Sequence, residues 1–290
     1  MTVKDPENGA ENVSVVLIGV GGASCSGKTT LAKHLNRILP DSVIIHQDDF
    51  APPQELVPIH PIHGVQDWDA APGAISWQRL NDTLREIKQT GRMPPDHRSH
   101  DHLNEQREIA IDDVLKARLV ADLKKAQQSV LTKTGAKTIF GILDGFLLYW
   151  NEMSESCLEC RGKYSSRDVM SAMAIIQQVR IRKSISKGDL TKTFALAPLP
   201  DSLGFFGIWF QSDPEGSLWR DPPGYWEDIV WPAYVDAHKD LFVDGDVENG
   251  QLSGEKVENL VLLDTLQLSM SDAVDKSCKV IQDYVLNKTA

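Results

Sequence analysis

Cysteine is scarce in this chain of 290 residues, and positive charge is outnumbered. The chain has four cysteines, of which only Cys157 and Cys160 stand at C-x-x-C spacing, so the two closely spaced pairs of a zinc site are missing. Lysine and arginine total 30 against 41 aspartates and glutamates, for a net charge of -11. No dense basic stripe offsets this acidity, which argues against nucleic acid as a partner. Small-molecule chemistry in a reducing compartment is favoured.

Long hydrophobic runs are also lacking. The longest apolar stretch, residues 138–150, is too short to span a bilayer and contains Asp144. Residues 1–12 are polar and acidic, without the basic region and apolar core of a signal peptide. We therefore expect a cytoplasmic protein without a membrane partner, with the nucleus as the alternative compartment. The sequence does not indicate an oligomeric state.

One strong motif is present. Residues 22–29 read G-x-x-x-x-G-K-T, between the apolar run 15–20 and an amphipathic helical pattern. Glycines allow backbone N–H groups to close around phosphates at a positive helix end, Lys28 can reach the β and γ oxygens, and Thr29 can offer its hydroxyl to Mg²⁺. The predicted ATP-binding residues are Gly22, Ala23, Ser24, Cys25, Ser26, Gly27, Lys28, Thr29 and Thr30.

Strands and helices are predicted to alternate along the chain. The further strands are residues 42–46, 138–143 and 260–263, and the helices are residues 75–90, 111–131 and 272–286. Such alternation indicates an α/β fold, with a parallel β-sheet flanked by helices as in P-loop NTPases of the nucleoside kinase type. We expect a disordered tail over residues 1–13 and a single domain over residues 14–290.

Acidic residues follow two of these strands. Asp48 and Asp49 come after the second, and Asp144 after the third, where the carboxyl ends of parallel strands form ligand sites. Phosphoryl transfer needs a phosphate cradle, a metal and a group that orients or deprotonates the acceptor hydroxyl. Lys28 and Asp48 are therefore the candidate catalytic residues, with Asp49 as the competitor of Asp48. Thr29, Asp48 and Asp144 are the candidate metal ligands, Asp144 acting through water. Helix capping and strand-end solvation are the purely structural alternatives for these aspartates.

Four motifs together resemble the nicotinamide riboside kinases, relatives of uridine kinase. They are Q-D-D-F at 47–50, Q-D-W-D at 66–69, D-G-F-L-L at 144–148, and D-P-P-G-Y-W at 221–226 followed by W-P at 231–232. The resemblance covers about residues 15–150 and 215 to the end. It implies ATP- and Mg²⁺-dependent phosphorylation of the 5′-hydroxyl of nicotinamide riboside, for NAD synthesis. Nicotinic acid riboside is another acceptor that it allows, and a uridine kinase is the nearest alternative.

The resemblance also implies roles for individual residues. Asp48 would receive the proton of the 5′-hydroxyl, and Asp69 would hold the ribose diol by charge-assisted hydrogen bonds. Trp68 would stack on the cationic pyridine ring, unless it is simply a core aromatic residue. The other implied substrate contacts are Asp49, Phe50 and Tyr225, and the implied adenine-pocket residues are Asp264 and Thr265.

Residues 151–214 depart from this pattern. The family has a fourth parallel strand here and then an arginine-rich lid close to R-R-x-x-R-x-G-Y, and this chain shows neither pattern. If codons are read one nucleotide early, residues 168–178 can encode R-R-H-E-R-H-G-Y-H-T-A, and residues 153–161 can encode an apolar strand. We therefore predict that residues 153–178 are an exon in the wrong frame and residues 179–214 are largely retained intron. The alternative is a divergent insertion. Without lid arginines, the chain could bind nucleotide yet turn over poorly.

Two remaining segments suggest structural roles. Residues 97–102 are rich in histidine, but they follow Gly91 and two prolines, which is typical of a loop more than of a metal site. Residues 51–72 form a long connection between predicted elements, which is typical of a substrate flap.

Overall fold

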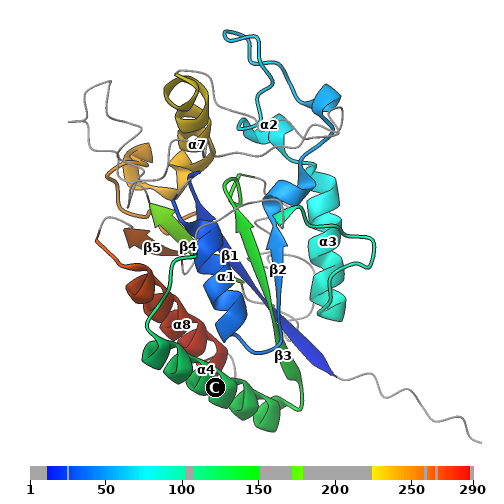
Figure 1. The fold of residues 1–290 in the computed structure, drawn as a ribbon, viewed down its shortest axis with the longest axis vertical. Helices are drawn as coiled ribbons and strands as arrows, with labels where there is room; N and C mark the ends of the chain where they lie inside the picture. The colour runs from blue at the N-terminus through cyan, green and yellow to red at the C-terminus, as the bar shows by residue number, and fades with distance from the viewer. Residues whose placement is uncertain are drawn as a thin grey trace, which may run out of the picture.

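The protein folds around one parallel β-sheet (Figure 1). The computed structural model describes residues 12–24, 26–101, 108–150, 224–257, 260–264 and 267–287, together with the backbone of residues 172–178. The sheet has the order β2-β3-β1-β4-β5, and all neighbouring strands pair in parallel. Its strands are β1 (Val13–Gly22), β2 (Ser42–His46), β3 (Lys137–Gly145), β4 (Ala172–Gln178) and β5 (Leu260–Asp264). The predicted α/β fold is confirmed.

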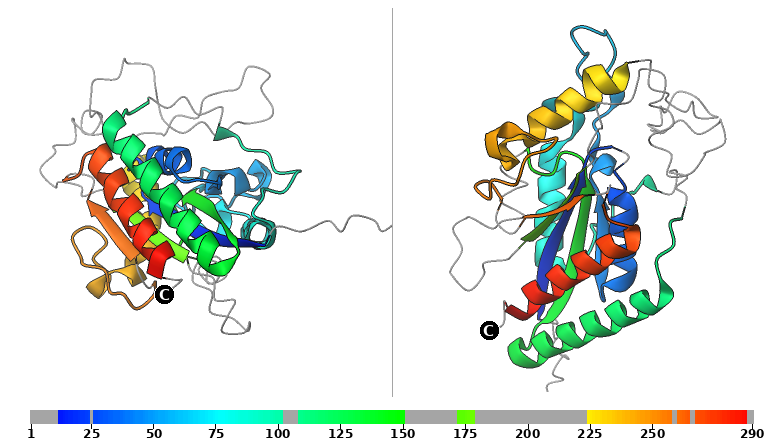
Figure 2. Two further views of the ribbon diagram at one scale, coloured as in Figure 1. Left: turned by 90° about the horizontal axis from the view of Figure 1, so that it is seen from below. Right: turned by 90° about the vertical axis from the view of Figure 1, so that its left-hand side faces the viewer.

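Helices cover both faces of the sheet (Figure 2). Successive side chains of β1 alternate between the two faces. Val16 and Ile18 belong to one buried apolar cluster with side chains of α1, α4 and α8. Val15 and Leu17 belong to a second cluster with side chains of α3 and α7. These helices are α1 (Lys28–Ile38), α3 (Trp77–Thr90), α4 (Asp113–Thr134), α7 (Trp231–His238) and α8 (Met270–Asn287), and a short helix, α2 (Ala71–Ala74), precedes α3.

Local signals explain where the helices begin and end. The Asp112 carboxylate caps α4 by accepting a 2.6 Å hydrogen bond from the Leu115 amide. Gly91 and Gly135 end α3 and α4 in the left-handed conformation, which glycine adopts at low cost. Among the described helices, none is long and apolar enough to cross a membrane.

Residues 151–214 do contain a fourth strand, although the family's sequence pattern for that strand is missing there. The backbone of residues 172–178 forms β4, which lies between β1 and β5 and pairs in parallel with both. The hypothesis of a mis-framed exon followed by retained intron stays a prediction. The other parts of this span, residues 151–171 and 179–223, lie outside the described residues, as do the Cys157 and Cys160 pair and the predicted tail over residues 1–11.

The buried histidine at the end of α7 leads to a stability prediction. His238 is fully buried, its Nδ1 lies 2.8 Å from the Tyr234 carbonyl oxygen, and burial lowers its pKa from 6.5 to about 4. The unfolded chain therefore binds a proton between pH 6.5 and about 4 that the folded chain does not, so stability falls as the pH is lowered through this range. We expect this group alone to contribute about 3 kcal/mol to that loss.

Urea unfolding at pH 7 and pH 4.5 measures this contribution. In a His238→Phe variant the loss of stability on acidification should be smaller than in the wild type. The exposed His63, replaced by glutamine, serves as the control and should leave the loss unchanged. An identical pH dependence in wild type and His238→Phe would contradict the assignment.

Candidate active site

The phosphate loop joins β1 to α1 at the carboxyl edge of the sheet. Gly27 has φ 88°, a left-handed conformation that leads directly into the first turn of α1. The Ser26 amide donates to the Ala23 carbonyl oxygen at 3.2 Å, which closes the loop. Ser24, Ser26 and Lys28 are buried, while Thr29 and Thr30 are half-buried. Cys25 lies outside the described residues. The loop therefore presents backbone N–H groups and a lysine at a helix N-terminus, as phosphate binding requires.

Aromatic side chains contact the phosphate loop and the end of β1. A Cβ atom on Gly21 would lie 2.8 Å from the Tyr149 ring, so only glycine allows the ring to pack this closely. The Tyr234 hydroxyl, on α7, forms a hydrogen bond with the backbone of Ala23, while burial raises its pKa. Neither contact was predicted from the sequence, because no local pattern links residues so far apart along the chain.

A short 3-10 turn, η1 (Gln47–Phe50), follows β2 and carries Asp48. In this turn Asp48 is exposed, whereas Gln47, Asp49 and Phe50 are buried. Protein atoms nevertheless surround Asp48 closely enough that loss of hydration raises its pKa; Lys28 opposes this shift, and Asp144 adds to it. Asp48 is therefore an accessible carboxylate near both the loop lysine and a second acidic group, a suitable environment for a general base.

Contacts from two residues outside the turn hold it in place. The Gln47 side chain accepts a hydrogen bond from the Leu147 amide at 2.9 Å. Arg79, from α3, donates to the Asp49 carbonyl oxygen at 2.5 Å, and its guanidinium lies 5.2 Å from the centre of the Phe50 ring. Asp49 and Phe50 thus face the protein interior, although the resemblance implies that they contact substrate.

Asp144, at the end of β3, pairs with a histidine that the sequence prediction missed. His46 Nδ1 lies 3.1 Å from Asp144 Oδ2. Burial lowers the pKa of His46, but the charges of Asp144, Asp101 and Asp49 more than offset this, so its pKa lies above the ordinary value. The other carboxylate oxygen, Asp144 Oδ1, is buried without a protein partner. It is free to accept a hydrogen bond from a metal-bound water.

The candidate metal ligands fit a Mg²⁺ ion that binds together with a nucleotide. Among the described residues, no group of three or more His, Cys, Asp or Glu side chains could hold a metal ion by itself. Mg²⁺ bound to a nucleotide needs few protein ligands, because phosphate oxygens and waters complete its octahedron. The half-buried Thr29, the exposed Asp48 and the unpartnered Asp144 Oδ1 are oxygen donors of the required kind.

The predicted substrate residues come together from two distant segments. Asp69 Oδ2 accepts a hydrogen bond from the Tyr225 hydroxyl at 3.3 Å, joining the 51–72 connection to residues before α7. Nearby in the chain, His63 Nε2 lies 3.6 Å from Asp228 Oδ2. Trp68 is buried, with 8% of its surface exposed. Asp69 and Tyr225 are therefore neighbours, as their shared role in substrate binding would require.

The adenine-pocket candidates are less informative. Asp264 is the half-buried last residue of β5, and its carbonyl oxygen accepts hydrogen bonds from the Gln267 and Leu268 amides. Thr265 lies outside the described residues. The structure thus places Asp264 at the carboxyl edge of the sheet, in a turn toward α8.

The strand order, the phosphate loop and the acidic turn after β2 define the class of protein: this is a P-loop kinase fold. No protein-family model matches the chain. It is similar, however, to curated proteins named nicotinamide riboside kinase. That of Schizosaccharomyces pombe is 27% identical over 84% of this chain and 87% of its own length. Those of Saccharomyces cerevisiae and Eremothecium gossypii are 27% and 26% identical, over 85% and 92% of this chain and 86% and 90% of their own lengths. These matches confirm the resemblance to the nicotinamide riboside kinases.

Proposed function

We propose that this protein transfers the γ-phosphoryl group of ATP to the 5′-hydroxyl of nicotinamide riboside, a step of NAD biosynthesis. One observation carries the proposal: the accessible carboxylate of Asp48 lies where the charges of Lys28 and Asp144 both act on it. A base, a phosphate-binding lysine and a second acidic group are the parts that phosphoryl transfer to a hydroxyl needs. The names of the three fungal relatives supply the acceptor.

The loop before α1 would bind the phosphates of ATP. Backbone N–H groups of residues 22–27 would surround the phosphates, and Lys28 would contact the β and γ oxygens. Thr29, Asp48 and, through water, Asp144 would hold Mg²⁺. These residues would hold the ion beside the phosphates, where its positive charge would offset the negative charge of the transferred group.

Asp48 and the predicted substrate-binding residues would bind and activate the acceptor. Asp48 would take the proton of the 5′-hydroxyl, and its raised pKa makes it a stronger base than an ordinary aspartate. Asp69 would accept hydrogen bonds from the ribose diol, with Tyr225 holding it in place. Trp68 would offer its indole face to the pyridinium ring, a favourable cation–π contact.

A direct assay tests this function. The purified protein, with Mg²⁺ and ATP, should convert nicotinamide riboside to its mononucleotide, as followed by chromatography. Nicotinic acid riboside and uridine are the competing acceptors in parallel reactions. Phosphorylation of uridine in preference to both pyridine ribosides would refute the proposed acceptor.

The role of Asp69 gives a separate prediction. In Asp69→Asn the KM for the riboside should rise about 10- to 100-fold, because the charge-assisted hydrogen bonds to the diol are lost. The change in kcat should be smaller, since the diol is remote from the transferred phosphoryl group. Tyr225→Phe removes the hydroxyl that donates to Asp69 and should have a weaker effect of the same kind. An unchanged KM in Asp69→Asn would show that the diol binds elsewhere.

A further inference from the structure

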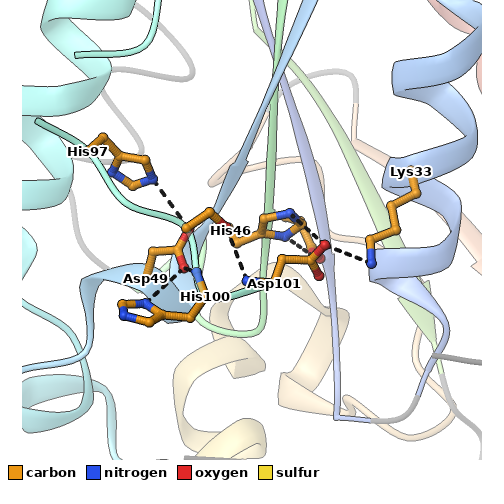
Figure 3. Close-up of polar contacts among 8 residues, drawn as sticks. Lys33, His46, Asp49, His97, His100 and Asp101 are labelled. Atoms are coloured by element: carbon orange, nitrogen blue, oxygen red, sulfur yellow. Dashed lines mark hydrogen bonds and ion pairs between the residues drawn. The ribbon is translucent and has the colours of Figure 1, made fainter. Parts of the chain in front are cut away.

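The histidine-rich segment between α3 and α4 makes contacts that none of the roles above explains. Residues 97–101, here called the strap, lie across the carboxyl ends of the strands (Figure 3). His97, His100 and Asp101 each contact the region around the 3-10 turn that carries Asp48. The strap therefore reaches the predicted catalytic turn from a part of the sequence for which only a loop is predicted.

The first anchor of the strap is the Asp49 carboxylate. Only 2% of this side chain is exposed, and a buried carboxylate is costly unless partners compensate it. The strap supplies them: the His100 amide donates to Asp49 Oδ1 at 2.8 Å, and the His100 Nδ1 lies 3.4 Å from the same oxygen. His97 Nε2 lies at an ion-pair distance of 3.3 Å from the other oxygen, Oδ2, but the two atoms do not form a hydrogen bond. Asp49 thus depends on the strap for its burial.

The second anchor of the strap is His46, at the end of β2. Asp101 Oδ2 lies 3.9 Å from His46 Nε2 and 2.8 Å from Lys33 Nζ, on α1. His46 in turn contacts Asp144 at the end of β3. Asp101 thus joins the helix after the phosphate loop to the end of β2, as Figure 3 shows for Lys33, Asp101 and His46, and His46 extends the contact to the end of β3.

A metal centre does not account for these contacts. His97 and His100 approach opposite oxygens of one carboxylate. Within the part of the chain that the structure describes, no three such side chains could hold an ion. The imidazoles instead bracket the carboxylate, which is an arrangement suited to holding it still.

We propose that the strap is a positioning element for Asp48, with His97 and Asp101 as its positioning residues. Its two anchor points, His46 and Asp49, stand two residues before and one residue after Asp48, so they hold the turn on both sides of the base. The inference rests on the proposed function in that Asp48 is the base of the kinase reaction. Displacing such a group by about 1 Å can cost on the order of 100-fold in rate.

Hydrogen exchange tests whether the strap restrains the turn that carries Asp48, and this test does not require enzymatic activity. In His97→Leu, the amides of residues 47–51 should exchange about tenfold or more faster than in the wild type, because the buried carboxylate loses a partner. The phosphate-loop amides should be unchanged. His97→Gln, which can keep an N–H near Asp49, should restore much of the protection. Arg98→Gln is the matched control, since Arg98 is an exposed residue of the same strap.

Kinetics test the consequence for Asp48. His97→Leu and Asp101→Asn should lower kcat about 10- to 100-fold and change the KM for the riboside and the Kd for Mg-ATP less than threefold. Equal exchange in His97→Leu and wild type would overturn the inference even if the enzyme is active, and so would a rise in KM at unchanged kcat. If the wild type fails to phosphorylate the riboside, the proposed function fails, and the exchange data still decide whether the strap holds the turn. If His97→Leu does not fold, Asp101→Asn carries the same comparison.

Discussion

Replacing Asp48 by asparagine should lower kcat about 10²- to 10⁴-fold, the range expected when a general base is removed. Asparagine keeps the size of the side chain but cannot take a proton from the acceptor hydroxyl. Because the phosphate loop and Lys28 are untouched, we expect the Kd for Mg-ATP to change less than tenfold. Single-turnover rates and calorimetric titration with nucleotide measure the two quantities.

The matched control for this variant is Asp236→Asn, which alters an exposed carboxylate on α7 paired with Lys239. Its kcat should equal that of the wild type. A kcat of Asp48→Asn within threefold of the wild type would show that another group, or solvent, accepts the proton. Asp49 is a poor substitute, because its carboxylate is buried against the strap.

The second large effect concerns residues 151–214, where we propose a mis-framed exon followed by retained intron. Removing residues 179–214 and restoring the shifted frame over residues 153–178 would return the lid arginines R-R-H-E-R-H-G-Y. Arginines that stabilise the transferred phosphoryl group can be worth on the order of 10³ to 10⁵ in rate. We therefore expect kcat to rise by a factor within that range.

Three experiments distinguish the frame hypothesis from a written segment that is functional as it stands. A variant that lacks residues 179–214 but keeps the written frame over 153–178 is the control, and it should gain little. Equal activity in the repaired and written chains would mean that the written segment supplies transition-state stabilisation by another route. Sequencing cDNA across the region gives an independent answer, because a transcript that encodes the residues as written, with no shorter form, excludes the frame hypothesis.

The written sequence and the shifted reading frame also differ in which residues would form the fourth strand. In the written chain it is Ala172–Gln178, placed between β1 and β5. In the shifted frame a strand would come from residues 153–161, and residues 172–178 would belong to the lid. The choice therefore changes which residues lie beside the phosphate loop.

Much of the fold could be predicted because its signals are local. The apolar run 42–46 is β2 residue for residue, and the predicted strands at 138–143 and 260–263 lie within β3 and β5. The helix predicted over 75–90 forms as Trp77–Thr90. In each case the apolar spacing of the segment already determines which face is buried.

The site could be predicted only in part, because orientation depends on contacts between distant residues. Asp48 and Asp49 are adjacent and chemically identical, yet one is exposed and the other buried. In a 3-10 turn, residues three apart share a side, so Gln47 and Phe50 both turn inward and Asp48 is left outside. The partners of Asp49 lie about fifty residues away, as the His100 contact shows, and no local pattern could reveal them.

The bond between Tyr234 and the backbone of Ala23 has a consequence for how the two substrates bind. Tyr234 stands on α7, a few residues after Tyr225, which holds Asp69. Binding of the nucleotide and binding of the riboside would thus order parts of one connected group of residues. Whichever ligand binds first would reduce the conformational-entropy cost of binding the second. Linkage then requires reciprocity: the riboside should tighten nucleotide binding by the same factor as the nucleotide tightens riboside binding, and Tyr234→Phe should bring both factors toward one.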